Sequence, residues 1–209
     1  MKKIIVTGCN GQLGRAVNKL YAGDNTFEFV NTDVGELDIT SIDQVMELAR
    51  EIKPYAIINC AAHTAVDACE TEGDRAYKIN AIGARNLSIA ASETGAKLVH
   101  ISTDYVFDGK GTRPYTEFDP TGPQGMYGLT KLAGENFVKD FADRYFIIRT
   151  AWLYGDGKNF VKTMLKLSET HEKVRVVKDQ VGSPTSADEL AKAIAYLLSL
   201  IHISEPTRP

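Results

Sequence analysis

The sequence lacks the cysteine pattern of a disulfide-stapled protein and the histidine spacing of a metal site. Only three of its 209 residues are cysteine, at Cys9, Cys60 and Cys69. An odd number without paired spacing does not indicate a disulfide framework. The four histidines show no metal-ligand spacing, and we therefore expect no metal ion.

Long apolar runs and an excess of positive charge are also missing. No stretch of about 18 consecutive apolar residues exists, so we expect no membrane-spanning segment. The apolar residues 4–6 are followed at once by polar residues 7–10, too early for a signal peptide, and the expected location is the cytoplasm. The net charge of −3 gives no basic stripe for nucleic acid.

Short β-branched runs alternate with longer amphipathic stretches along the chain. The alternation predicts an α/β fold, a doubly wound parallel sheet of Rossmann type with helices on both faces. The expected strands cover residues 4–6, 28–32, 56–60, 97–101, 144–149 and 174–177. The expected helices cover residues 12–22, 41–52, 78–94, 126–142, 159–168 and 188–198.

A glycine-rich turn follows the first expected strand, with Gly8, Gly11 and Gly14 spaced G-x-x-G-x-x-G. Gly8 permits a tight turn, Gly11 lets the backbone approach a pyrophosphate at a helix N-terminus, and Gly14 allows close helix packing. A strand before this turn and a helix after it favour a dinucleotide site over a turn without a ligand.

Other candidate cofactor contacts follow the second and third expected strands. Asp33 ends the second strand, where a carboxylate commonly accepts hydrogen bonds from ribose hydroxyls. Asp38 is a candidate for the adenine amino group, with helix capping as its rival role, although Thr40 or Ser41 suits the cap better. Small residues after the third strand leave room for a cofactor; this segment includes Ala61, Ala62, His63 and Thr64.

The predicted chemical centre combines Thr103, which follows the fourth main strand, with Tyr127 and Lys131 on the next helix. Positions i and i+4 share a helix face, so the phenol and the ammonium can point into one cleft. We expect the ammonium and an oxidised nicotinamide to favour the phenolate, which would lower the pKa of Tyr127 from about 10. Tyr127 would then supply a proton while the Thr103 hydroxyl holds the substrate oxygen. The set predicts a nicotinamide-dependent oxidoreductase acting on an alcohol or a ketone.

Four segments carry a resemblance to a known family: residues 102–107, 127–135, 149–155 and 179–185. They resemble the dTDP-4-dehydrorhamnose reductases, within the extended short-chain dehydrogenase/reductases. That family reduces the 4-keto group of dTDP-4-dehydro-L-rhamnose to dTDP-L-rhamnose with NADPH or NADH. The resemblance covers roughly residues 1–198.

The resemblance implies roles for individual residues. Thr103, Tyr127 and Lys131 would form the catalytic set. Thr103, Asp104 and Trp152 would contact the dTDP-sugar. The cofactor would lie against Gly11, Gln12, Leu13, Asp38, Ile39, His63 and Thr64, with Tyr127 and Lys131 reaching the same cofactor. Asp33 favours NADH, yet the family uses both NADH and NADPH, so the choice of cofactor stays open. Whether the chain forms a homodimer also stays open.

The resemblance also suggests how the chain is divided. Residues 1–198 would form the dinucleotide-binding domain, with partial substrate-binding elements at about 150–198. The family continues into a substrate-binding lobe, and residues 199–209 match nothing expected there. We expect these residues to be a disordered, non-native tail, and the chain to hold the cofactor but bind the sugar nucleotide poorly.

Two alternatives remain open at this point. The first is another extended-family enzyme on a nucleotide sugar, such as an epimerase; a dehydratase is disfavoured because Asp104 is followed by Tyr105 and not by glutamate. The second is a non-catalytic, dinucleotide-binding regulatory subunit similar to the methionine adenosyltransferase β subunit. The intact set of Thr103, Tyr127 and Lys131 disfavours this second alternative.

Overall fold

The computed structural model of the chain describes residues 1–23, 25–157 and 159–200. The chain divides into two compact units, each of which is described by itself. The first unit contains residues 1–9 and 24–150. The second contains residues 10–23 and 151–209.

The first unit is built on a five-stranded parallel sheet with the order β2-β1-β3-β4-β5. The strands are β1 (Lys2–Thr7), β2 (Phe27–Thr32), β3 (Ala56–Asn59), β4 (Lys97–Thr103) and β5 (Tyr145–Thr150). The order reverses at β1, whose two neighbours are β2 and β3. In open sheets of this kind ligands bind outside the carboxyl ends of the strands, at such a reversal.

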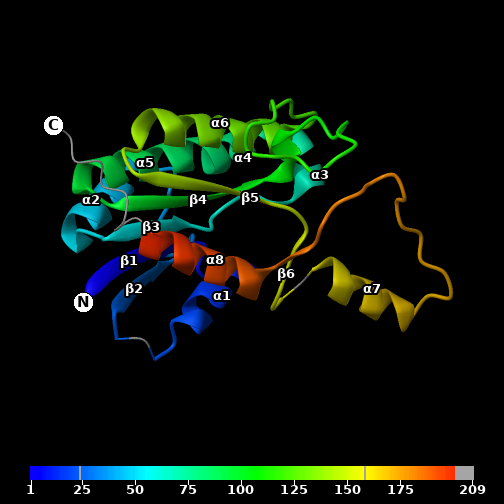
Figure 1. The fold of residues 1–209 in the computed structure, drawn as a ribbon, viewed down its shortest axis with the longest axis horizontal. Helices are drawn as coiled ribbons and strands as arrows, with labels where there is room; N and C mark the ends of the chain where they lie inside the picture. The colour runs from blue at the N-terminus through cyan, green and yellow to red at the C-terminus, as the bar shows by residue number, and fades with distance from the viewer. Residues whose placement is uncertain (24, 158, 201–209) are drawn as a thin grey trace. The chain divides into compact units, whose positions relative to one another are not determined.

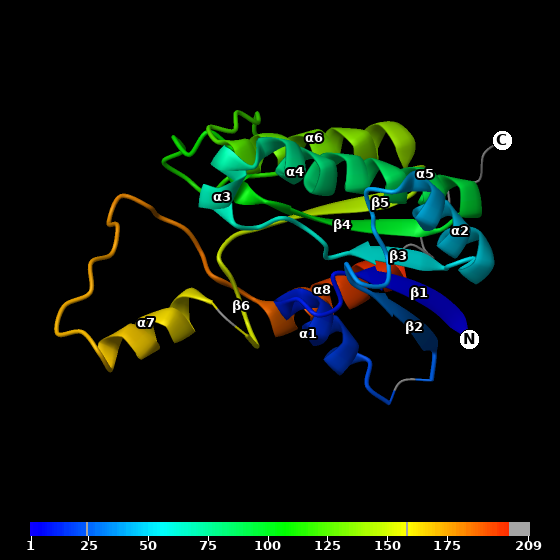
Figure 2. The same cartoon turned by 180° about the vertical axis from the view of Figure 1, so that it is seen from behind.

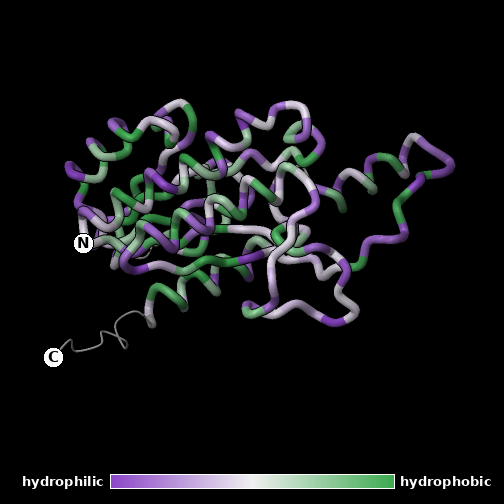
Figure 3. The backbone as a smooth tube through the Cα atoms, turned by 90° about the horizontal axis from the view of Figure 1, so that it is seen from above, coloured by the Kyte–Doolittle hydropathy of each residue, from purple (hydrophilic) through white to green (hydrophobic). Residues whose placement is uncertain are grey.

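Helices cover one face of this sheet through an apolar core. The helices are α2 (Ile42–Ile52), α5 (Gly83–Thr94) and α6 (Met126–Phe141), and α5 and α6 run side by side along the strands (Figure 1, Figure 2). Ile5, Ile57 and Leu98 of three adjacent strands pack against Leu87 of α5 and Val138 of α6. Hydrophobic and hydrophilic residues alternate along the helices (Figure 3), as helices with one buried face require. The parallel sheet with its flanking helices confirms the predicted Rossmann-type fold.

The second unit contains α1 (Gln12–Leu20), α7 (Phe160–Ser168) and α8 (Ala187–Leu200). Helices α1 and α8 contact each other, and Lys19 of α1 forms a 3.6 Å ion pair with Asp188 of α8. Two short strands, β6 (Leu153–Tyr154) and β7 (Thr185–Ser186), pair in parallel. Asn159 caps α7 by accepting a 3.1 Å hydrogen bond from the Lys162 N–H.

Several elements differ from those expected. The predicted strand over residues 174–177 is wrong: this segment has no strand geometry, and Val176 and Val177 are 55% and 66% exposed. β-branched residues favour a strand only where a neighbouring strand and a buried face accept them. Strands β6 and β7 were not predicted, because a strand of only two residues shows no alternation of apolar and polar residues in the sequence.

The predicted helix over residues 78–94 begins earlier and is not uniform. It contains α4 (Gly73–Tyr77), a π-helical turn η1 (Lys78–Ile82) and α5, and a further helix, α3 (Val66–Thr71), precedes it. Helix α8 continues to Leu200, two residues beyond its expected end. The remainder of the predicted tail, residues 201–209, lies outside the described residues.

Two features are absent from the described residues. None of the helices there is long and apolar enough to cross a membrane. The same residues contain no group of three or more His, Cys, Asp or Glu side chains that could hold a metal ion.

Candidate functional site

Thr103, Tyr127 and Lys131 come from two elements that meet at one end of the sheet. Thr103 is the last residue of β4, so this strand runs two residues beyond its expected end. Tyr127 and Lys131 lie in the first two turns of α6, which begins at Met126. The Met126 N–H donates a 2.8 Å hydrogen bond to Glu70 Oε1, which satisfies one of the free amides at this helix end.

Polar contacts join these side chains to their neighbours. The Thr103 hydroxyl lies close enough to the Tyr127 phenol to lower its pKa, and Thr103 Oγ1 donates to Asp104 Oδ1 at 3.0 Å. The Tyr105 ring meets the Tyr127 ring edge-on, with centroids 5.5 Å apart. The Lys131 ammonium donates to the Ile101 carbonyl oxygen at 2.6 Å. The Tyr105 ring therefore packs beside the phenol, and the Thr103 hydroxyl ends β4 next to both.

The acid–base state of the pair follows mainly from burial. Burial, with a smaller contribution from the nearby Asp104 charge, raises the pKa of Tyr127 to about 12 against the lowering effect of Thr103. Burial also lowers the pKa of Lys131 to about 8, while the negative charge of Glu135 opposes that change. At neutral pH the phenol is therefore protonated and the amine carries its charge.

The expectation that Lys131 and an oxidised nicotinamide together lower the pKa of Tyr127 concerns the cofactor complex. In the polypeptide alone, the free-energy cost of removing a phenolate from water exceeds the gain from its favourable contacts. The charged form loses hydration, and its neighbours do not replace the lost interactions with water. The Lys131 ammonium is directed to the Ile101 carbonyl. A protonated phenol is the form that can give a proton to a substrate oxygen.

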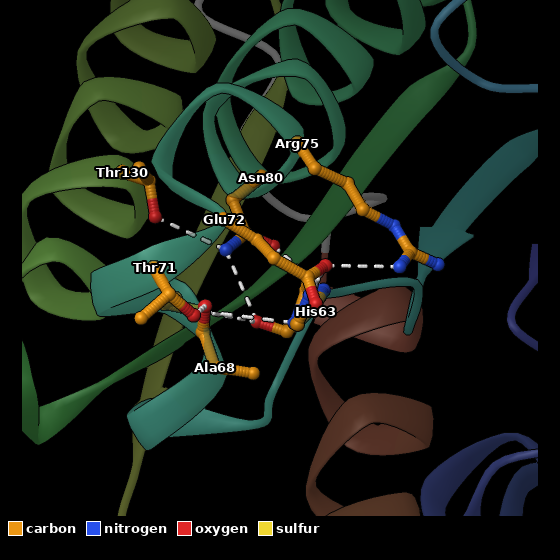
Figure 4. Close-up of polar contacts among 8 residues, drawn as sticks. His63, Ala68, Thr71, Glu72, Arg75, Asn80 and Thr130 are labelled. Atoms are coloured by element: carbon orange, nitrogen blue, oxygen red, sulfur yellow. Dashed lines mark hydrogen bonds and ion pairs between the residues drawn. The ribbon is translucent and has the colours of Figure 1, made fainter.

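The segment after β3 is tied to α6 by one buried side chain (Figure 4). The His63 N–H donates to Asn80 Oδ1 at 2.8 Å, and Asn80 Nδ2 donates to the His63 carbonyl at 3.2 Å. Asn80 Nδ2 also donates to Thr130 Oγ1 at 3.1 Å, one position before Lys131. Asn80 is 1% exposed and lies in the π-helical turn η1, a feature often found at functional sites.

The His63 ring lies within a small polar cluster (Figure 4). His63 Nε2 is 3.5 Å from Glu72 Oε2, which also accepts a 2.9 Å hydrogen bond from Arg75 Nη1. On the other side of the ring, Cys69 Sγ is 3.7 Å from His63 Nδ1. Contacts on both ring nitrogens fix the orientation of this imidazole.

Most of the predicted cofactor contacts of the first unit follow adjacent strands at the same sheet edge. Gly8 follows β1, Asp33 follows β2, and the segment from Ala61 to Thr64 follows β3. Gly8 has φ +65°, and a Cβ there would lie 2.9 Å from the Ala61 backbone, so the turn and this segment approach closely. Thr103 ends β4 at the same edge.

Asp38 and Ile39 lie in the connection between β2 and α2. Asp38 Oδ1 accepts hydrogen bonds from the Thr40 N–H at 2.9 Å and from Thr40 Oγ1 at 2.7 Å, and it therefore shapes this turn. Ser41 caps α2, as expected, with its hydroxyl accepting from the Gln44 N–H at 3.4 Å. Ile39 is buried at 7% exposure.

The other predicted residues belong to the second unit. Gly11 is the N-cap of α1, and Gln12, Leu13 and Gly14 form its first turn. No side chain caps this helix and no acidic residue lies in its first turn, which suits the binding of an anion such as a pyrophosphate. Trp152 is 44% exposed with φ +47°, and it is therefore not the core residue that a lone tryptophan often is.

The chain resembles known proteins over most of its length. The family model of the RmlD substrate binding domain matches residues 1–207. A crystal structure of a dTDP-4-dehydrorhamnose reductase from Clostridium acetobutylicum is 56% identical, with a TM-score of 0.92. The chain belongs to the dTDP-4-dehydrorhamnose reductase family. This confirms the resemblance carried by the four sequence segments.

Further members of the dTDP-4-dehydrorhamnose reductase family and its relatives agree with this assignment. The reductase from Bacillus anthracis str. Ames, solved in complex with NADP, is 48% identical with a TM-score of 0.91. The spore coat polysaccharide biosynthesis protein SpsK of Bacillus subtilis is 43% identical over 209 residues.

The matches cover nearly all of this chain but only part of the longer relatives. They cover 98% of the chain and 74% of SpsK, 94% and 70% for the Clostridium acetobutylicum reductase, and 95% and 71% for the Bacillus anthracis reductase. The chain therefore spans about three quarters or less of each of these three proteins.

Asn80 and Glu135 are two buried polar residues near the site that the sequence-based reasoning did not select. Glu135 lies four positions after Lys131, and this spacing could have indicated it. Asn80 gave no comparable signal, because its partners His63 and Thr130 are 17 and 50 positions away.

Proposed function

We propose that the chain catalyses the NAD(P)H-dependent reduction of the 4-keto group of dTDP-4-dehydro-L-rhamnose to dTDP-L-rhamnose. The observation that carries the proposal is the half-buried Tyr127 phenol, close enough to the Thr103 hydroxyl for that group to lower its pKa, with Lys131 one turn further along α6. The membership of the dTDP-4-dehydrorhamnose reductase family supports it.

In this proposal Tyr127 is the proton donor. Its raised pKa keeps the phenol protonated at neutral pH, ready to protonate the oxygen of the ketone as it becomes an alcohol. Thr103 would hold that oxygen through its hydroxyl, and Lys131 would bind the cofactor and add positive charge near the reacting oxygen. A positioned general acid of this kind contributes about 10²–10⁴-fold to the rate.

The cofactor would lie along the carboxyl edge of the sheet. Gly8 and the segment from Ala61 to Thr64 would line it, and the uncapped first turn of α1, from Gly11 to Gly14, would receive the pyrophosphate. Asp33, Asp38 and Ile39 would face the adenosine part. A bound NADPH or NADH supplies the hydride for the carbonyl carbon; the NADP complex of the Bacillus anthracis relative supports NADPH, and Asp33 supports NADH.

Asp104 and Trp152 complete the proposed contacts with the dTDP-sugar, together with Thr103. The half-exposed Trp152 ring offers an apolar face on which a base or sugar can stack. The cytoplasmic location and the possible homodimer predicted from the sequence stay parts of this proposal.

The test is a turnover assay on the purified chain. The chain is incubated with dTDP-4-dehydro-L-rhamnose and either NADPH or NADH, and the absorbance of the reduced cofactor is followed. We expect Tyr127→Phe to lower kcat by about 10²–10⁴-fold with little change in cofactor affinity. The matched control is Tyr77→Phe, which alters a 42% exposed tyrosine and should turn over like the parent.

Two results would contradict the proposal. Full turnover by Tyr127→Phe would remove the phenol from the reaction. Tight cofactor binding without turnover, at a dTDP-sugar concentration that a separate calorimetric titration shows to saturate the folded parent, would favour the non-catalytic, regulatory alternative.

A further inference from the structure

Glu135 is a fully buried carboxylate with no role in the proposed reaction. It lies four positions after Lys131 on α6, on the same face of the helix, and its side chain is 0% exposed. A buried charge is costly unless partners replace its hydration. The partners of Glu135 therefore indicate what the carboxylate does.

Two neighbouring strands supply those partners. Ser102 Oγ of β4 donates to Glu135 Oε1 at 2.6 Å. Arg149 of β5 donates from Nε to Oε1 at 2.9 Å and from Nη2 to Oε2 at 2.7 Å, a bidentate pair. Ser102 and Arg149 are register partners in the sheet, directly before Thr103 and Thr150. One carboxylate thus fastens α6 to both strand ends.

The network extends from Arg149 toward the connection between β4 and α6. The Arg149 guanidinium lies 4.8 Å from the centroid of the Phe107 ring. Phe107 stacks on Tyr115, with centroids 4.2 Å apart and an interplanar angle of 3°, and Tyr115 OH donates to Asp108 Oδ1 at 3.0 Å. The carboxylate is therefore linked to the segment that precedes the proposed proton donor.

Glu135 also dominates the charge around Lys131. The titratable groups that act on this amine are Glu135 on α6, Cys60 after β3 and His100 on β4. Burial raises the pKa of Cys60 to about 12 and lowers that of His100 well below its usual range, so both are neutral at neutral pH. The charges around Glu135 itself are Arg149 and Lys139, whose Nζ is 3.8 Å from Oε2.

We propose that Glu135 is a positioning residue for Tyr127 and Lys131: its carboxylate fixes α6, which carries both side chains, against the ends of β4 and β5, and places a negative charge one helical turn from the Lys131 amine. Its effect on the Lys131 amine does not depend on the proposed function. Its effect on turnover rests on the proposed function.

The experiment measures Lys131 directly. Lysine side chains are labelled with ¹³C and titrated by NMR, with the Lys131 signal assigned by its loss in Lys131→Arg. In the parent we expect a midpoint of about 8. In Glu135→Gln, which keeps the size and removes the charge, the midpoint should fall by about one unit. The alkaline limb of the pH profile of kcat should move down with it.

The matched control is Glu93→Gln. Glu93 also pairs with an arginine through two contacts, Arg50 Nε at 2.6 Å and Nη2 at 3.2 Å, but this pair is exposed. Its substitution should leave the Lys131 midpoint and the pH profile unchanged. If Glu135→Gln leaves Arg149 unpaired and does not fold, the double variant Glu135→Gln/Arg149→Met is compared with Arg149→Met, so that only the carboxylate charge differs between the two chains.

An unchanged Lys131 midpoint in Glu135→Gln relative to the parent, or in the double variant relative to Arg149→Met, would overturn the proposal. A shifted midpoint in a chain that reduces no dTDP-sugar would uphold the proposal while the proposed function fails. A chain that reduces the dTDP-sugar, but whose Lys131 midpoint and pH profile are the same with and without the Glu135 carboxylate, would overturn the proposal while the proposed function stands.

Discussion

Replacing Asn80 tests whether the segment after β3 is held in place for the cofactor. In Asn80→Ala the amide that joins His63 to Thr130 is lost, while the π-helical turn around it can persist because alanine favours helical geometry. The His63 N–H and carbonyl and the Thr130 hydroxyl each lose a buried partner.

The magnitude follows from these three hydrogen bonds. Each contributes about 1 kcal/mol net, and a buried group left without a partner costs about 1–3 kcal/mol. The free energy of unfolding should therefore fall by about 3 kcal/mol. Because Asn80 is only 1% exposed, water cannot easily replace the lost contacts.

The informative measurement is cofactor affinity rather than stability alone. Urea unfolding gives the stability loss, and calorimetric titration gives the NADPH affinity of the folded variant. We expect the affinity to fall by about tenfold, which corresponds to about 1.4 kcal/mol, because the freed His63 segment must be ordered on binding.

The control is Leu87→Ala. Leu87 is 1% exposed in the core, and its truncation should cost about 2–5 kcal/mol without touching the His63 segment. Equal NADPH affinities for the two variants and the parent would refute the reasoning, since the Asn80 contacts would then serve stability only.

Two further outcomes are expected. A Cβ on Gly128 would lie 2.2 Å from the Tyr105 carbonyl oxygen. Gly128→Ala should therefore displace the start of α6, lower the free energy of unfolding in urea by about 1–3 kcal/mol and lower turnover. Gly35→Ala is the control, because the space around Gly35 is open and the substitution should be neutral; equal stability and turnover of the two variants would contradict this reasoning. The second outcome concerns pH: the pKa of Lys131 is lowered to about 8 in the folded chain. Above pH 8 the unfolded chain therefore binds more protons at Lys131 than the folded chain does, and the free energy of unfolding rises with pH. The raised pKa of Cys60 has the opposite effect above about pH 9. The unfolding free energy of the parent minus that of Lys131→Met should rise by about 1 kcal/mol from pH 8 to 9. A difference that does not change with pH would show that the amine is not buried.

The central sheet could be predicted because each strand is a short β-branched run closed by turn residues. All five strands of the first unit lie where the sequence placed them, to within three residues at either end. The strand expected over residues 174–177 shows the limit of this reasoning, since three valines form a strand only beside a partner. The π-helical turn η1 is invisible to a pattern with a period of 3.6 residues.

The proposed site was predictable where spacing along one element decides the geometry. Tyr127 and Lys131 share a helix face because they are four residues apart, and Thr103 ends the adjacent strand. The pKa of Tyr127 could not be anticipated, because burial outweighs its neighbours. Asn80 was missed because its function depends on partners from distant segments.

The π-helical turn at η1 (Lys78–Ile82) constrains how the length of this helix can vary. A π-turn accommodates one residue more than an α-turn, so the segments on its two sides are rotated by about 100° relative to an uninterrupted helix. Helix α4, which precedes the turn, can thus follow the direction of the chain that leaves α3, while α5 keeps its apolar side on the sheet. Deleting a single residue here would swing one half around the axis, and either the core contacts or the Asn80 contacts would be lost. Exchanges that conserve length are therefore far easier to accommodate at this point than insertions or deletions.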